Sequence, residues 1–339
     1  MPRAFLIGGT GQVGRAVALR LAADGWEVAV GSRRGSLPDG LAASGIRAVA
    51  VDRSRSGELQ RALGSGVDLL VDVVPYEPAD AAQLNALAGR VGSLVAISSA
   101  SVYADERGRT LDEATDLDTF PELPVPIPEE QRTVAPGDET YSTKKRAIEL
   151  ALLDGPLEAT IFRACALHGP GSELPRELFF VKRILDGRRA VVLVSNGESR
   201  FHTTSVANAA ELIRLAAARP GKRVLNCADP DPPTVREIGV AISAALGREL
   251  EQVPIPENGY ERRELSNPWA VPRPLVVDMS AAEREVGYRP VTAYPEAVRE
   301  TCAWLVDEVP RRDWSETYLG RYFDYAAEDA VLRSRVTDR

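Results

Sequence analysis

Cysteine, histidine and lysine are all scarce in this sequence. Three cysteines and two histidines in 339 residues, widely spaced, are too few for a disulfide framework and show no metal-ligand pattern. We therefore expect free thiols and no metal site. Only four lysines accompany 37 arginines. A lysine placed one helical turn after a tyrosine is consequently an informative choice.

Long apolar runs and an excess of positive charge are missing as well. No run reaches the roughly 18 residues of a membrane span, and the first residues lack the pattern of a signal peptide. We therefore expect a cytoplasmic protein without a membrane partner. A net charge of −8 argues against a nucleic-acid partner, because such surfaces need a basic stripe. The expected partner is a small-molecule substrate.

The first half of the chain alternates short apolar runs with helical patterns. Runs such as AFLIG (4–8) and SLVAIS (93–98) are typical of strands buried on both faces of a parallel sheet. Helical patterns over 55–64, 78–90 and 138–153 lie between such runs, which predicts right-handed βαβ units. The expected fold class is α/β, a doubly wound parallel Rossmann sheet with a smaller C-terminal α/β substrate domain.

The predicted domain division follows from these patterns. Residues 1–165 are expected to form the Rossmann domain, and 201–228 to return to it through the strand-like run RVLNC. Residues 166–339 are expected to form mainly the substrate-binding domain. The acidic, proline-rich segment 104–140 cannot be a helix or an inner strand through its prolines. It is either a surface excursion or a lid over a ligand.

A glycine-rich stretch, LIGGTGQVGRAV, ends the first apolar run and opens the first helical pattern. Its G-x-x-G-x-x-G spacing allows a tight turn and a close backbone approach, and free N–H groups at a helix start bind anions. The stretch predicts a dinucleotide pyrophosphate site; the alternative is a glycine turn without a ligand. The predicted cofactor contacts are Gly8, Thr10, Gly11, Gln12, Val13 and Gly14, and further along the chain Val74 and Ala164.

The end of the second predicted strand indicates which dinucleotide is bound. NAD-binding proteins usually carry an acidic residue there for the ribose hydroxyls. Ser32, Arg33 and Arg34 stand there instead, and a guanidinium can pair with a 2′-phosphate. We therefore expect NADP rather than NAD, unless these arginines are only solvated. Asp52, after the third strand, is a candidate partner for the adenine amino group.

The stretch YSTKK (141–145) places Tyr141 and Lys145 four residues apart, on one face of a predicted helix. A phenol can act as acid or base if a neighbouring cation lowers its pKa. Lysine suits that position because its compact ammonium can bond ribose hydroxyls and relay protons. Both residues are expected to contact the cofactor. Three serines at the end of a predicted strand, Ser98, Ser99 and Ser101, are candidates to hold the substrate oxygen.

These stretches together resemble the extended branch of the short-chain dehydrogenase/reductase superfamily, which includes NAD(P)-dependent epimerases and dehydratases. GGTGQVG is similar to its cofactor loop, SSASVYA to its serine motif and YSTKK to its Tyr-x-x-x-Lys motif. The resemblance covers nearly the whole chain. It implies that Tyr141 is the catalytic acid/base, that Lys145 orients it, and that Ser99 holds the substrate oxygen. It also implies a possible homodimer through 78–90 and 138–153.

The substrate side of the site departs from this resemblance. The position of an asparagine common in nucleotide-sugar members is Ala166, and a usual tyrosine is replaced by His168. Substrate contacts are predicted at Ser101, Tyr103, His168 and Arg200.

Three functions remain open at this point. The first is an NADP(H)-dependent oxidoreductase that interconverts a ketone and a secondary alcohol. The second is a nucleotide-sugar epimerase or dehydratase with a tightly bound cofactor. The third is a non-catalytic cofactor sensor or RNA-binding relative, which the acidic net charge disfavours.

Overall fold

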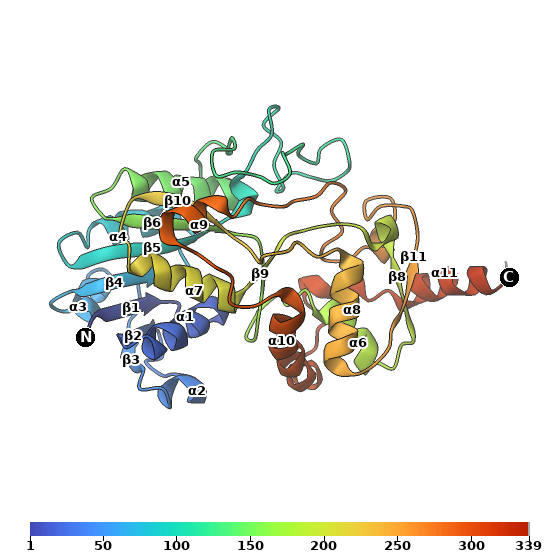
Figure 1. The fold of residues 1–339 in the computed structure, drawn as a ribbon, viewed down its shortest axis with the longest axis horizontal. Coiled ribbons are helices and arrows are strands. Elements are labelled where there is room, and N and C mark those ends of the chain that lie inside the picture. The colour runs from blue at the N-terminus through green and yellow to red at the C-terminus, as the bar shows by residue number, and fades with distance from the viewer. Residues whose placement is uncertain (338–339) are drawn as a thin grey trace.

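The computed structural model describes residues 1–337 and shows a seven-stranded parallel sheet with helices on both faces (Figure 1). The strand order is β10-β6-β5-β4-β1-β2-β3. Successive connections change sides between β1 and β4, and a crevice forms there at the carboxyl ends of the strands. The predicted fold class is confirmed. The strands are β1 Arg3–Ile7, β2 Glu27–Ser32, β3 Arg47–Ala50, β4 Val67–Asp72, β5 Val91–Ser99, β6 Ala159–Ala164 and β10 Arg223–Cys227.

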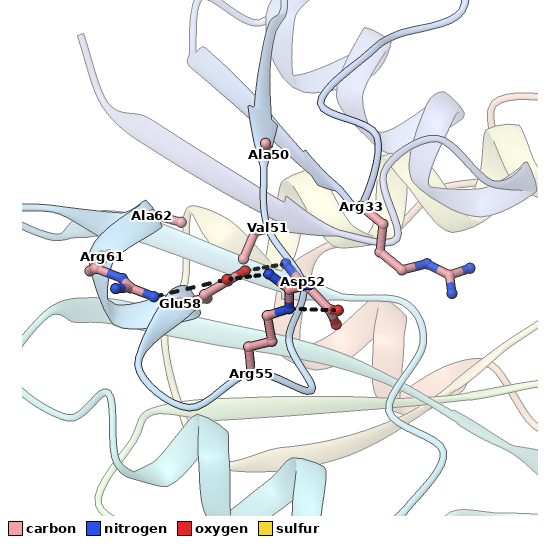
Figure 2. A pocket seen from close by; sticks show the side chains of 8 residues that line it. All are labelled: Arg33, Ala50, Val51, Asp52, Arg55, Glu58, Arg61 and Ala62. Atoms are coloured by element: carbon pink, nitrogen blue, oxygen red, sulfur yellow. Dashed lines mark hydrogen bonds and ion pairs between the residues drawn. The ribbon is translucent and has the colours of Figure 1, made fainter.

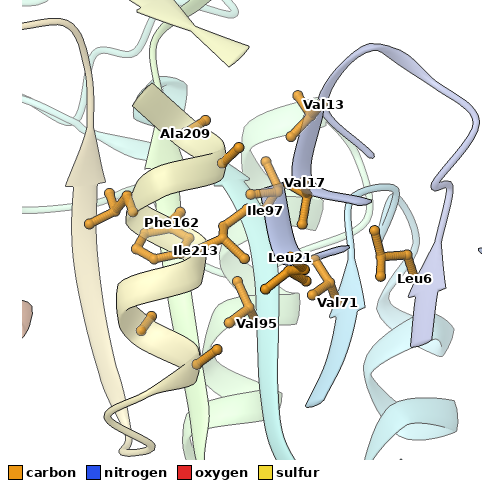
Figure 3. Close-up of a cluster of buried hydrophobic side chains, with 14 of the residues drawn as sticks. Leu6, Val13, Val17, Leu21, Val71, Val95, Ile97, Phe162, Ala209 and Ile213 are labelled. Carbon is orange, nitrogen blue, oxygen red and sulfur yellow. The ribbon is translucent and has the colours of Figure 1, made fainter. Parts of the chain in front are cut away.

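One face of the sheet carries the helices α1 (Gln12–Ala23) and α7 (Val206–Ala217). Leu21 of α1 and Ile213 of α7 are buried in one cluster with Phe162 of β6 (Figure 3). Burying such a side chain contributes roughly 1.5–3 kcal/mol. Helix α9 (Ser280–Val286) packs beside α7, so segments far along the chain complete this layer.

The opposite face carries the short α3 (Glu58–Leu63), α4 (Pro78–Asn85) and α5 (Tyr141–Leu153). The helix expected over 78–90 ends earlier because the chain turns through Gly89, at a φ of 84°, before β5 begins. Helices α4 and α5 pack against each other. A homodimer through them stays a prediction.

The second half of the chain builds a smaller layer around its own core. Helices α6 (Leu178–Leu185), α8 (Val235–Leu246) and α10 (Tyr294–Glu308) enclose buried aromatic side chains that include Trp269. Pro175 precedes the first turn of helix α6. The remaining elements are the paired strands β8 Ala190–Leu193 and β11 Glu251–Pro254, the paired strands β7 Ala166–His168 and β9 Thr203–Ser205, and the short helix α2 Asp39–Ala42.

Helix α11 (Tyr325–Thr337) is held against this second layer by the buried carboxylate of Glu328. Glu328 pairs with Arg183 at 3.2 Å and with Arg188 at 3.0 Å, and it accepts a hydrogen bond from Val192 N. Within residues 1–337 no helix combines the length and apolar character needed to cross a membrane.

Segment 104–140 contains no helix or strand and lies across both layers (Figure 1). Asp105 organises its first turn by accepting bonds from the backbone of Arg107 and Arg109. Arg273 donates to the carbonyls of Leu117 and Phe120, which ties the segment to the second layer. The segment is therefore an ordered strap, and its role as a lid stays a prediction.

Candidate active site

The glycine loop forms a tight connection between β1 and α1. Gly8 adopts a φ of 77°, which favours glycine. A Cβ on Gly14 would lie 2.4 Å from the carbonyl oxygen of Gly8, so α1 packs directly on the turn. Gly11 precedes the helix and has no side chain to cap its first N–H groups. These groups remain available to an anion, so the loop fits a dinucleotide pyrophosphate.

A cavity of about 820 Å³ opens at the carboxyl ends of the central strands. The glycine loop and Tyr141 both line it, although the loop follows β1 and Tyr141 begins α5, far along the chain. Of the predicted contacts, the cavity is lined by Gly8, Gly11, Gln12, Val13, Arg33, Val74, Ser99, Ser101, Tyr141 and Ala164. The predicted contacts outside its lining are Thr10, Gly14, Ser32, Arg34, Asp52 and Lys145.

Tyr141 is the first residue of α5, and Thr140 fixes that helix start. The Thr140 hydroxyl accepts from the N–H of Thr143, whose side chain in turn accepts from the N–H of Thr140. The Tyr141 side chain is held at the cavity edge, 48% exposed. Partial burial raises the pKa of Tyr141 above its usual value, while a side-chain hydrogen bond with Ser99 acts to lower it. The phenol is therefore protonated at neutral pH.

Lys145 lies one turn deeper in α5 and is 2% exposed. Its Nζ donates to the carbonyls of Pro75 at 2.8 Å and Ile97 at 3.0 Å. An ammonium carries three N–H groups, so one remains. The nitrogen is 5.6 Å from the ring centre of Tyr141. Desolvation lowers the pKa of Lys145 to about 8.

The three serines at the end of β5 have different hydrogen-bond partners. Ser99 accepts a hydrogen bond from Ser101 N at 3.1 Å, and Ser101 accepts one from the Ser142 hydroxyl at 2.8 Å. Ser98 points the other way and donates to Glu149 at 2.7 Å. Of the three, Ser99 and Ser101 line the cavity and Ser98 does not.

The arginine side of the cavity borders a second, neighbouring cavity of about 510 Å³ (Figure 2). Arg33 lines both cavities, and Figure 2 shows its side chain pointing away from Asp52. Asp52 lines only the neighbouring cavity, where it accepts a bond from Ser54 and lies 3.6 Å from Arg55. Ser32 donates to Ser36 O within its own turn.

Three predicted substrate contacts, Tyr103, His168 and Arg200, do not line the cavity, and their role in binding stays a prediction. Tyr103 is completely buried, and its hydroxyl donates to Asn226 at 2.6 Å. His168 is buried and its Nε2 lies 2.8 Å from an oxygen of Asp229. Arg200 donates to the carbonyl of Pro232. Bonds within the protein occupy the hydroxyl of Tyr103 and Nε2 of His168, whereas Nδ1 of the buried His168 has no hydrogen-bond partner among the residues that the structure describes.

Several cavity residues were absent from the sequence predictions. Tyr76, Glu173, Arg176 and Phe201 line the cavity with Tyr141. A strand-end signal was present for Tyr76, which follows β4, but the other three lie on loops whose path depends on the second layer. Among residues 1–337, no cluster of three or more metal-ligating side chains is found.

A further cavity of about 800 Å³ continues from the first. Leu111 of the strap and Phe201 line both cavities. The continuation also has aromatic and charged walls from the C-terminal segment, including Tyr318 and Arg321. The site therefore has room for a ligand that extends well beyond the reacting group.

A Rossmann sheet with a glycine loop and a Ser-Tyr-Lys group defines a class of nicotinamide-dependent enzymes. The particular family is given by a family model: NAD dependent epimerase/dehydratase, which matches residues 4–228. Because the match spans most of the chain, the protein belongs to this family of enzymes.

Solved epimerase structures share the fold. The UDP-glucose 4-epimerase of Thermotoga maritima, with UDP-glucose, has a TM-score of 0.67 and 16% identity, over 91% of this chain and 99% of its own. An epimerase of Methanothermobacter thermautotrophicus has a TM-score of 0.68 and 16% identity, over 91% and 94%. A Bacillus cereus UDP-glucuronic acid 4-epimerase variant, with NAD and a fluorinated substrate, has a TM-score of 0.65 and 13% identity, over 90% and 99%. Such identities show the fold alone.

Proposed function

We propose that this protein interconverts a secondary alcohol and a ketone, with a nicotinamide cofactor on the glycine loop and Tyr141 as acid/base. The observation that carries the proposal is the shared cavity, which Ser99, Tyr141 and the loop residues Gly8 and Gly11 all line. The cofactor, when bound, supplies or accepts the hydride. The chain itself contributes binding, orientation and proton transfer.

The proton is handled by Tyr141 and the oxygen is held by Ser99. A protonated phenol suits reduction, since it can give its proton to the substrate oxygen as the carbonyl is reduced. For oxidation the same phenol must lose its proton, and a nearby cation favours that. Lys145 of α5 is that cation, since its Nζ lies 5.6 Å from the ring centre of Tyr141. The Ser99 hydroxyl donates to the oxygen where negative charge develops.

A second candidate is a nucleotide-sugar epimerase, and the continuation cavity favours it. A space of about 800 Å³ beyond Phe201 suits the remote part of a large substrate. The chain would then oxidise and re-reduce one carbon with no net cofactor change. Absorbance at 340 nm during turnover of UDP-glucose, UDP-glucuronic acid and simple ketones separates the two. A lasting change supports net redox chemistry, and product without a change supports epimerisation.

The cofactor is proposed to be NADP, with Arg33 as its 2′-phosphate partner. Arg33 is exposed and borders both cavities, and among the side chains that the structure describes it makes no hydrogen bond or close ion pair, although its charge acts on Asp52. Arg33→Ala is expected to weaken NADPH binding about 30-fold and NADH binding less than about threefold, since a guanidinium–phosphate pair is strong. Calorimetry with both cofactors checks this, with Arg61→Ala as the control. Tighter wild-type binding of NADH than of NADPH contradicts the assignment.

The substrate is proposed to carry an anionic group that Arg176 binds. Arg176 lines the cavity and stacks on Phe201 at 5.3 Å from the ring centre. No carboxylate among residues 1–337 lies within salt-bridge distance of it, and the adjacent Glu177 is buried against Tyr294. Burial lowers the pKa of Arg176, and the neighbouring charge of Glu177 offsets this effect only in part.

Arg176→Gln is therefore expected to weaken binding of UDP-glucuronic acid by about 30-fold, since losing a desolvated charge partner costs about 2 kcal/mol or more. Calorimetry on the cofactor-saturated protein measures it. Arg200→Gln is the matched control, because Arg200 is engaged by Pro232 and Glu237 outside the cavity. Equal losses in both variants contradict a specific role for Arg176.

A further inference from the structure

The segment VVPYEP (73–78) fixes an aromatic side chain at the cavity edge. Tyr76 lies between the end of β4 and the start of α4. Its backbone N–H and that of Glu77 both donate to Asp80, at 2.9 and 3.0 Å. With Pro75 before it and Pro78 after Glu77, the backbone at this position has little freedom. Only the side chain of Tyr76 can move easily.

The Tyr76 ring covers the Lys145 ammonium. The Nζ of Lys145 is 4.8 Å from the ring centre, closer than to the ring of Tyr141. Tyr76 is 53% exposed and lines the cavity, whereas Lys145 is 2% exposed and does not. The exposed ring is therefore in a position to separate the buried nitrogen from the cavity. A cation over an aromatic face is also attracted to it.

The hydroxyl of Tyr76 does not anchor the ring to the protein. It makes no hydrogen bond with any of residues 1–337, in contrast to the buried Tyr103, whose hydroxyl is bound by Asn226. One N–H of Lys145 remains after the bonds to Pro75 and Ile97. Rotation of the ring would open that N–H to the cavity.

We propose that Tyr76 is a positioning residue, which shields the Lys145 ammonium from the cavity and exposes it by rotating away. The shield keeps water from the ammonium until a ligand displaces the ring. The functional part of this proposal rests on the proposed role of Lys145 beside Tyr141. The shielding itself can be measured without any substrate.

The charged groups around Lys145 determine how its pKa should respond to loss of the Tyr76 ring. Asp72 of β4, Asp80 of α4 and Glu149 of α5 face it and favour its charged form, yet desolvation outweighs them and lowers the pKa of Lys145 to about 8. The neighbouring Tyr141 is protonated and adds no charge. Removing the ring admits water, which stabilises the ammonium. The pKa of Lys145 should then rise toward the ordinary lysine value of about 10.4.

The four lysines make this titration directly observable. Protein carrying ¹³C-lysine gives four side-chain signals, and the Lys145 signal is identified by its loss in Lys145→Arg. In Tyr76→Ala the midpoint is expected to rise by at least about one pH unit, as burial shifts of this kind reach several units. Tyr76→Phe keeps the ring and should titrate like the wild type. An unchanged midpoint in Tyr76→Ala, or an equal rise in Tyr76→Phe, overturns the proposal.

Acetylation provides a second readout with an internal reference. Brief treatment with acetic anhydride followed by mass spectrometry compares Lys145 with its neighbour Lys144, which is paired with Glu77 at the surface. When each rate is divided by the neutral fraction of that amine taken from the titration, Tyr76→Ala should acetylate Lys145 at least about tenfold faster relative to Lys144, because the reagent gains access to the amine. Should the alanine variant unfold, Tyr76→Leu replaces it, with an expected increase of about threefold on the same physical ground. No increase in a folded variant overturns the shield.

These outcomes are independent of the proposed reaction. A wild-type protein with no turnover on any substrate would count against the function, while the titration would still report on Tyr76. Conversely, an active enzyme whose Lys145 titrates identically in Tyr76→Ala would retain its function and lose the shield.

Discussion

Tyr141→Phe is expected to lower kcat by about 10³-fold, because general acid–base catalysis by one positioned group contributes about 10²–10⁴-fold. The variant removes only the hydroxyl that the cavity presents beside Ser99. Cofactor affinity should stay within roughly threefold of the wild type, since the ring that borders the binding space is retained. Steady-state kinetics on the substrate found by the panel, together with cofactor calorimetry, measure both quantities.

Tyr103→Phe is the matched control for this result. Tyr103 lies in the serine motif that also contains Ser99. Its hydroxyl is buried and donates to Asn226 away from the cavity. Its removal should lower the free energy of unfolding by about 1–2 kcal/mol and leave kcat within about threefold. A Tyr141→Phe enzyme with near-wild-type kcat contradicts the proposed mechanism, whatever the control shows.

Glu149→Gln is expected to lower the free energy of unfolding by about 3–5 kcal/mol, the usual loss when one member of a buried ion pair is removed. Glu149 is fully buried two turns after Tyr141 and binds Ser98 of β5 at 2.7 Å. Arg163 of β6 donates to it at 2.8 and 3.0 Å. The variant leaves the Arg163 guanidinium buried without its counter-charge. Urea unfolding followed by circular dichroism measures the loss.

The pH dependence of that loss has a definite sign. Bonds from Arg163 and Ser98 lower the pKa of Glu149 against the effect of burial. Stabilisation by a group with a lowered pKa is present above its unfolded value, near 4.5, and is lost as the pH falls through the folded value. The gap between wild type and variant should therefore narrow below pH 4.5. Glu308→Gln, which disrupts a surface pair with Arg311, should cost less than about 1 kcal/mol. Equal costs for both variants contradict the buried clamp.

The parallel sheet was predictable because its strands are continuous apolar runs separated by helical patterns. Both faces of β1, β4 and β5 are buried, so burial and sequence pattern agree there. Helix ends were less predictable, because they depend on single turns such as the one at Gly89. The short strands β7 and β9 lack any pattern of their own and exist through pairing with each other.

The residues of the candidate site were also predictable only in part. Ser99 and Tyr141 are at positions where local rules act, a strand end and a helix start, and both reach the cavity. His168 ends the short strand β7 and Arg200 lies on a loop, and their partners Asp229 and Pro232 are distant in sequence. No local rule reports such a partner. The sequence alone also could not single out Arg176 among the many arginines, because its exposure to the cavity depends on how the second layer packs on the sheet.

A crystal structure of this protein with NADP⁺ bound tests the central claim most directly. The diphosphate is expected on the N–H groups after Gly11, and the nicotinamide is expected beside Tyr141. Hydride transfer needs reacting atoms about 3–3.5 Å apart. The reacting carbon of the substrate would occupy the space next to nicotinamide C4. The phenol oxygen should therefore lie within about 5 Å of that space, close enough to reach the substrate oxygen. A diphosphate bound elsewhere, or a nicotinamide more than about 10 Å from that phenol, would contradict the account, because no proton could then pass directly from Tyr141 to the substrate oxygen.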